Sequence, residues 1–564
     1  MTIKFKFVLK TIIFLLCLSY TSVIKADGPV PQKDQPKIIN IINFIRQTDY
    51  RVKNADSLLF DATEKQVELL KQHSFPGTFL LQYDALVNPK YQQLLKDELG
   101  NDSEIGAWWE ITKPHAEAAG IIWRGKHDWV STANIAFATG YTPSERERLV
   151  DVYMAKFKSI FGYYPKSVGS WFIDAHTLLY MYEKYNIVAS SNCKDQVGTD
   201  GYTLWGGYWN QAYYPSKLNA YMPAQSTANQ IPVPIFRMLG SDPIYQYDMG
   251  VGTGGQGVVS LEPVYKHAGM DKAWVDYFLE SIVNQPSLAF NYAQVGQENS
   301  FTWNEMKDGL RMQFPILDSL RTIGKIRIET LQTSGEWFKK EFPLTPATAV
   351  TTLSDHKNEG KKSVWYNSRF YRANLYFERN AFRFRDIHLF DENFESAYLK
   401  QPGTGGQFFY YTLPVVDGFF WSTKTERAGL RLMKINKNGK REELILQNPI
   451  VTEQAKDRML ITGVDQFKNV FKIEFKENEI DVSCQSTNKT FKWLLELNMP
   501  TERLDEHPFQ LDNSPELIAD FRKYTYQIPL KKGRINKGDG TDFVFQFIPS
   551  GNTVIIDTQI KHLQ

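Results

Sequence analysis

Cysteine is scarce in this chain: its 564 residues contain three, at positions 17, 193 and 484. The two that follow the N-terminal segment are too few for a disulfide framework, and they are not spaced like metal ligands. Histidine is also sparse, and the nine histidines contain no His-x3-His pair of the kind expected in a metal-dependent deacetylase. The sequence also lacks the Gly-x-Ser-x-Gly elbow that a serine esterase of the α/β-hydrolase type requires. We therefore predict neither a metal site nor a cofactor.

A strong excess of charge of one sign is also missing. Lysine plus arginine (65) minus aspartate plus glutamate (63) gives +2, and four of the lysines fall in the first 26 residues, which contain no acid. The remainder therefore carries 61 basic and 63 acidic residues, a balance of −2. This balance removes any electrostatic argument for a nucleic-acid partner.

Long apolar runs are missing apart from residues 11–20, a stretch too short to span a bilayer comfortably. Three lysines precede this run, and Ile24-Lys25-Ala26 follows it as a plausible cleavage site, which is the pattern of a signal peptide over residues 1–26. We expect a periplasmic or extracellular protein without a membrane span in its mature form. A retained membrane anchor is the alternative.

The remaining composition is that of a globular protein, with 42% hydrophobic and 23% charged residues. A chain of this length exceeds the size of a single hydrophobic core, so at least two domains are expected. From about residue 74 to 331, strand-like runs such as 78–82, 104–109 and 167–172 alternate with helical runs. The helix after Gly140 has the clearest start, because Thr142, Pro143 and Glu145 form a capping box with proline at the first position.

Repeated strand and helix units of this kind predict an α/β barrel of the (β/α)7 or (β/α)8 type over residues 27–340. Past residue 341 helical periodicity is lost, and Pro343-Leu344-Thr345-Pro346 marks the boundary. Period-two segments and an Asn438-Gly439 hairpin signal then predict an antiparallel β-sandwich domain over residues 341–564. This second domain either binds glycan or supports the barrel. Within it, Asp386 and His388 are compatible with a cation site or with a solvated strand edge.

Acidic residues recur where the predicted barrel strands end, which is the edge that carries catalytic groups in this architecture. Glycoside cleavage needs two carboxyl groups, one that protonates the leaving oxygen and one that attacks carbon or activates water. A helix cap or a solvated loop is the alternative role for each of them. The acids at predicted strand ends are Asp84, Glu110, Asp174, Asp248, Glu262 and Glu298.

Tryptophan is concentrated in the first part of the chain, where ten of the 13 precede residue 341. Flat rings beside carboxylates and amides suit a sugar, whose apolar face packs on an aromatic ring while its hydroxyls form hydrogen bonds. Ordinary core packing is the alternative for each ring. The predicted substrate-binding residues are Asp84, Trp108, Trp109, Glu110, Trp171, Asp200, Trp205, Trp209, Glu262, Gln297 and Trp303.

The segment Trp171-Phe172-Ile173-Asp174 resembles the Trp-x-Pro-Glu strand end of glycoside hydrolase family 57, within the NodB-like (β/α)7 barrels of glycoside hydrolases and deacetylases. Aspartate replaces the nucleophilic glutamate here, and isoleucine replaces the proline. The resemblance implies a barrel of this kind and a catalytic Asp174. The whole chain also resembles a two-domain family of exported proteins from glycan-degrading Gram-negative bacteria, through phrases such as Gly296-Gln297-Glu298-Asn299-Ser300.

The function predicted from the sequence is a glycoside hydrolase that acts on an oligo- or polysaccharide. Asp174 would act as nucleophile or base, and Glu298 or Asp248 would donate the proton. A glycan-binding protein on a degenerate barrel and a polysaccharide deacetylase are the alternatives. The sugar, the linkage, the stereochemical outcome and the oligomeric state are left open.

Overall fold

The computed structural model describes residues 35–379 and 381–561, and the expected signal peptide lies outside this part of the chain. The described residues from Gln35 onward belong to one compact unit. Within them, no helix has the length and apolar character that crossing a membrane would require.

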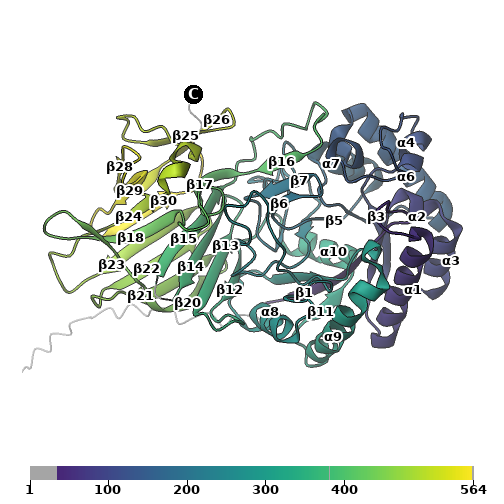
Figure 1. The fold of residues 1–564 in the computed structure, drawn as a ribbon, viewed down its shortest axis with the longest axis horizontal. Coiled ribbons are helices and arrows are strands. Elements are labelled where there is room, and N and C mark those ends of the chain that lie inside the picture. The colour runs from purple at the N-terminus through teal and green to yellow at the C-terminus, as the bar shows by residue number, and fades with distance from the viewer. Residues whose placement is uncertain (1–34, 380, 562–564) are drawn as a thin grey trace, which may run out of the picture. The chain divides into compact units, whose positions relative to one another are not determined.

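The first part of the chain is built around a parallel, barrel-like sheet, of which Figure 1 labels β1, β3 and β5. The order of its parallel strands is β10-β1-β2-β3-β4-β5-β9. Strand β8 (Ala212–Tyr213) extends it antiparallel to β9, and β11 (Arg327–Glu329) pairs with the start of β1. No backbone pairing between β9 and β10 is present among the described residues, so the sheet is nearly closed rather than closed. The parallel strands are β1 (Lys37–Ile45), β2 (Thr78–Leu81), β3 (Glu104–Trp108), β4 (Ser167–Gly169), β5 (Ala189–Asn192), β9 (Ile235–Arg237) and β10 (Asn291–Val295).

Helices follow most of these strands. The predicted capping box of α6 is confirmed, because Thr142 and Glu145 exchange hydrogen bonds at its first turn. The described helices are α1 (Ala55–His73), α2 (Tyr83–Val87), α3 (Pro89–Glu98), α4 (Lys113–Ala118), α5 (Ala133–Ala136), α6 (Pro143–Phe161), α7 (Ala175–Tyr185), α8 (Lys272–Asn284), α9 (Thr302–Thr322) and α10 (Leu331–Glu341), with short 3-10 turns η1 (Ala138–Gly140), η2 (Asn299–Phe301) and η3 (Thr501–Glu506).

Alternation along the strands divides the barrel core into two layers. Phe44, Leu80 and Trp108 belong to an inner cluster, whereas Leu81 and Trp109 belong to the layer that packs on the helices. Two adjacent tryptophans at the end of β3 therefore face opposite sides of the sheet. Only Trp108 points toward the barrel interior.

The second part of the chain consists of antiparallel sheets. Ring contacts of Tyr366 and Phe384 with Phe475 join the two largest. The ten-stranded sheet contains β12 (Thr348–Thr352), β13 (Lys361–Asn367), β14 (Tyr371–Glu378), β15 (Ala381–Leu389), β17 (Leu413–Asp417), β18 (Gly429–Ile435), β19 (Arg441–Glu443), β24 (Trp493–Asn498), β28 (Arg534–Lys537) and β29 (Phe545–Ile548). The six-stranded sheet contains β20 (Gln447–Ala455), β21 (Arg458–Val464), β22 (Val470–Lys476), β23 (Glu479–Gln485), β27 (Leu530–Lys532) and β30 (Thr553–Asp557), and β25 (Leu517–Phe521) pairs with β26 (Tyr524–Ile528).

One strand from the second part joins the loops of the barrel. Strand β16 (Phe408–Tyr411) pairs in parallel with β7 (Tyr202–Trp205), which itself pairs with β6 (Gln196–Thr199). The two parts of the chain thus share a small sheet, which a division at residue 340 by sequence alone does not anticipate.

Candidate functional site

One arginine brings together two acids from separate strand ends of the barrel-like sheet. Arg46 follows β1 directly, and its Nη2 donates to Glu110 Oε2 at 2.9 Å, with a second bond from Nε at 3.1 Å. Its Nη1 lies 2.8 Å from Glu298 Oε2, beyond the end of β10. All three side chains are buried. The carboxyl ends of β1, β3 and β10 therefore place a cation and a pair of carboxyl groups at one edge of the sheet.

The backbone around Arg46 is fixed by the motif that carries Glu298. Asn299 accepts from Arg46 N at 3.0 Å and donates to Arg46 O at 2.7 Å. Gly296 turns the chain out of β10 with φ +98, and a Cβ at this position would lie 2.2 Å from Ile42 O, so only glycine fits. The geometry of the acid pair is thus set by rigid strand ends and short side-chain bonds.

The two glutamates of this pair have different surroundings. The hydrogen-bonding capacity of Glu110 is filled, because its carboxylate also accepts from Trp108 Nε1 at 2.7 Å and from Gln82 Nε2 at 3.0 Å. Glu298 Oε2 contacts Arg46 but has no hydrogen-bond donor aligned on it among the described residues. The pKa of Glu298 is raised to about 7, because burial, together with the charges of Glu110 and Asp200, outweighs the opposing charge of Arg46. A glutamate whose pKa lies near neutrality therefore lies beside one that accepts hydrogen bonds from an arginine, a tryptophan and a glutamine.

Further predicted residues lie around this pair. Gln297 Nε2 donates to Glu262 Oε1 at 3.2 Å, and Ser260 donates to the other oxygen at 2.6 Å. At the rim, Asp200 forms an ion pair of 3.4 Å with Arg51, and the side chains of Asp200 and Arg51 are 43% and 40% exposed. Burial raises the pKa of Glu262, while the charge of Lys194 lowers it and that of Asp200 raises it. The structure thus brings Glu110, Glu262, Gln297, Glu298 and Asp200 together at one edge.

Aromatic rings border the same edge. Trp108 stacks on Phe44 with 4.4 Å between ring centroids, and Trp171 meets Trp108 edge-on at 5.1 Å. Trp129, which the sequence analysis did not select, lies under the guanidinium groups of Arg46 at 4.3 Å and Arg51 at 4.9 Å. No motif distinguishes Trp129 from the other tryptophans of this part of the chain.

Asp174 occupies a helix-cap position, which is the alternative to a catalytic role that the sequence leaves open for it. Its carboxylate accepts from Thr177 N at 3.0 Å as the cap of α7, bonds to the Thr177 hydroxyl, and pairs with the buried Arg146 at 3.0 Å. These contacts favour a structural role for Asp174.

Replacing Asp174 with asparagine tests this role. Asparagine retains the capping oxygen, but it removes the charge that balances Arg146, so we expect a loss of roughly 1–3 kcal/mol of folding stability. Any turnover should be preserved. Denaturant unfolding measures the first quantity, and the variant's kcat on a wild-type substrate measures the second. An inactive but normally stable variant would restore Asp174 as a catalytic candidate.

Three other predicted residues also have structural partners. Asp248 pairs with Arg385 at 3.0 Å and with Arg383 at 3.6 Å, both from β15. Asp84 accepts from the amides of Gln47 and Thr48 and so fixes the loop after Arg46; burial raises its pKa to about 7. Trp303 stands under Arg311, at 5.6 Å between the guanidinium carbon and the ring centroid.

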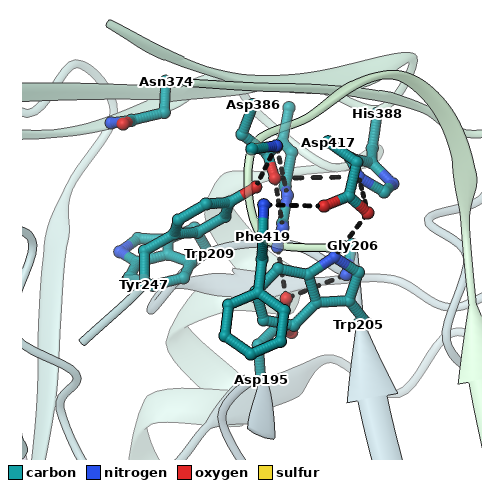
Figure 2. A network of polar contacts seen from close by, with 12 residues as sticks. Asp195, Trp205, Gly206, Trp209, Tyr247, Asn374, Asp386, His388, Asp417 and Phe419 are labelled. Carbon is teal, nitrogen blue, oxygen red and sulfur yellow. Dashed lines mark hydrogen bonds and ion pairs between the residues drawn. The ribbon is translucent and has the colours of Figure 1, made fainter. Parts of the chain in front are cut away.

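Trp205 and Trp209 belong to a second polar network, between the barrel and β14, β15 and β17 (Figure 2). Arg372 forms two bonds with Asp386, at 2.9 and 2.8 Å, and also donates to Asp195. Trp205 donates to Asp417, and Trp209 stacks on Trp365 with 3.8 Å between centroids. Asp386 and His388 are buried, so a solvated strand edge does not describe them.

This second network is balanced internally. Burial alone would raise the pKa of Asp195, but the guanidinium groups of Arg372 and Arg237 outweigh it and leave the pKa below its usual value. Within the described part of the chain, no group of three or more His, Cys, Asp or Glu side chains is placed to bind a metal ion. A surface cavity of about 440 Å³ lined by residues between Lys113 and Trp123 contains none of the acids discussed here.

No protein-family model and no curated protein matches this chain. Among solved structures, it is similar to a Parabacteroides distasonis protein provisionally described as a glycoside hydrolase/deacetylase, with 15% identity, a TM-score of 0.49, and coverage of 68% of this chain and 92% of that one. Proteins provisionally described as polysaccharide deacetylases from Mycobacterium smegmatis (11%, TM-score 0.35, 56% and 96% covered) and Pseudomonas aeruginosa PAO1 (9%, TM-score 0.34, 55% and 93% covered) are also similar. Likenesses at this level carry no argument about activity, which must rest on the residues themselves.

Proposed function

We propose that this protein is an exported glycoside hydrolase in which Glu298 is the proton donor and Glu110 is the second carboxylate. The observation that carries the proposal is the sharing of the buried Arg46 by two glutamates whose surroundings differ. Hydrolysis of a glycosidic bond needs one carboxyl group that is protonated near neutral pH and one that is ionised. The raised pKa of Glu298 and the fully hydrogen-bonded Glu110 supply this combination.

The surrounding residues have consistent roles in this proposal. Arg46 holds Glu110 ionised and fixes the direction of both carboxyl groups. Gln297, Glu262 and Asp200 would bind sugar hydroxyls, and Trp108 and Trp171 border the sugar ring. Water or the Glu110 carboxylate would attack the anomeric carbon while Glu298 gives its proton to the leaving oxygen.

The proposal is tested by incubating the protein with a glycan panel and analysing the products. New reducing ends, released equally with and without a chelator, are expected. Acetate release that a chelator stops would instead support the deacetylase alternative. Binding of a glycan without new reducing ends or acetate would support the glycan-binding alternative and contradict hydrolysis.

The pH dependence of hydrolysis follows from the same two carboxyl groups. The proton donor is active when protonated, so kcat/KM should fall as the pH rises through about 7, the pKa of Glu298. The acid limb should lie above the ordinary range for glutamate, because burial raises the pKa of Glu110 as well. Initial rates between pH 4 and 9 measure both limbs. A rate that stays flat up to pH 9 would contradict the role of Glu298.

A further inference from the structure

A buried lysine at the same edge of the sheet has no described partner. Lys194 is the second residue after β5, it is 1% exposed, and no described residue accepts a hydrogen bond from its Nζ. An ammonium group withdrawn from water without an acceptor is costly, and native structures rarely leave one unsatisfied. Burial lowers the pKa of Lys194, and the nearby charge of Glu262 partly restores it.

The groups whose charges act on Lys194 already have other hydrogen-bond partners or stay neutral. The two oxygens of Glu262 accept from Gln297 and Ser260. Asp195 is bound by Arg237 at 2.7 Å and by Arg372. Burial raises the pKa of Cys193 to about 12, so its thiol stays protonated and offers no full negative charge.

The other cations of this edge are also engaged. Arg46 is held by Glu110 and Glu298, and Arg51 is held by Asp49 at 2.7 Å and by Asp200. Lys194 therefore differs from the arginines around it, since its donors are unused within the described part of the chain.

We propose that Lys194 binds a carboxylate of the substrate, so that the glycan cleaved at Glu298 and Glu110 contains a uronic acid or another carboxylate-bearing sugar. This inference rests on the proposed hydrolytic function. A carboxylate supplies the missing acceptor and adds a full negative charge to that of Glu262, whereas a neutral hydroxyl supplies the acceptor alone. Its negative charge would also favour the protonated form of Glu298, which is the form that donates a proton.

Paired substrates test this inference without relying on a variant. Acidic glycans and the same glycans after chemical reduction of their carboxyl groups have identical linkages and differ only in that each carboxylate has become a neutral hydroxymethyl group. Calorimetry on the Glu298→Gln protein should show at least about 30-fold weaker binding of the reduced form, as expected for removal of one partner from a buried charge pair. Lys194→Met should lose this preference, and Lys266→Met, at an exposed lysine of the neighbouring loop, should keep it.

The outcomes separate this inference from the function on which it rests. Equal binding and equal cleavage of acidic and reduced glycans would overturn the role of Lys194 and leave glycoside hydrolysis standing. A preference that persists in Lys194→Met would overturn it as well. If no glycan is cleaved, hydrolysis fails, while carboxylate-dependent binding that requires Lys194 would still support the inference.

Discussion

Glu298→Gln is expected to lower kcat by about 10²- to 10⁴-fold, the usual contribution of a general acid. Glutamine has nearly the shape of glutamate and can still meet Arg46, but it cannot give a proton to the leaving oxygen. Substrate affinity and the unfolding transition should stay close to those of the wild type, because the substitution removes one of two acids that share a single guanidinium group. Steady-state kinetics on a substrate identified with the glycan panel measures this effect.

A matched control lies seven residues further along the chain. Glu305 is exposed in the first turn of α9, so Glu305→Gln should retain wild-type kcat. A Glu298→Gln protein with undiminished kcat would remove Glu298 from the mechanism. A loss of activity accompanied by loss of the folded state would instead assign the residue to structure.

Arg372→Met is expected to destabilise the protein by about 3–5 kcal/mol, the cost of breaking a buried ion pair by removing one partner. Arg372 is fully buried and is shared by Asp195 and Asp386, so its loss leaves two carboxylates with less compensation. Because Asp195 follows β5 and Asp386 lies on β15, the substitution should weaken the attachment of the two parts of the chain to each other. Guanidinium-induced unfolding, followed by tryptophan fluorescence, measures the loss.

The control for this variant is Arg458→Met. Arg458 is exposed at the start of β21, and surface substitutions of this kind usually change stability by less than about 0.5 kcal/mol. An Arg372→Met protein as stable as the control would show that the network in Figure 2 contributes little to stability.

Local signals in the sequence predict much of the barrel. Strands β2 and β3 and the capping box of α6 agree with the expected segments, because each depends on neighbouring residues alone. The same kind of signal leaves two roles open for Asp174. An aspartate that follows a strand and precedes a helix is also an ideal helix cap, and the sequence does not reveal that Arg146 pairs with it.

The centre of the candidate site depends on long-range pairing. The predicted barrel covers residues 27–340, but its alternating strand and helix signals begin only at about residue 74, so the sequence does not single out β1 or Arg46. Arg46 meets Glu298 only because β1 pairs with β10, more than 250 positions away in the sequence. Likewise, the opposite orientations of Trp108 and Trp109 follow from the side of the sheet that each faces, which composition does not specify.

The most direct test of the account is the titration of Glu298 itself. Carbon-detected NMR of protein labelled at the glutamate carboxyl carbons, with Glu298→Gln used for assignment, follows this group without any substrate. A midpoint near pH 7 is predicted, because burial and two neighbouring acids outweigh Arg46. A midpoint near the ordinary glutamate value of about 4.3 would mean that Glu298 is ionised at neutral pH, and it would contradict the proposed proton donor.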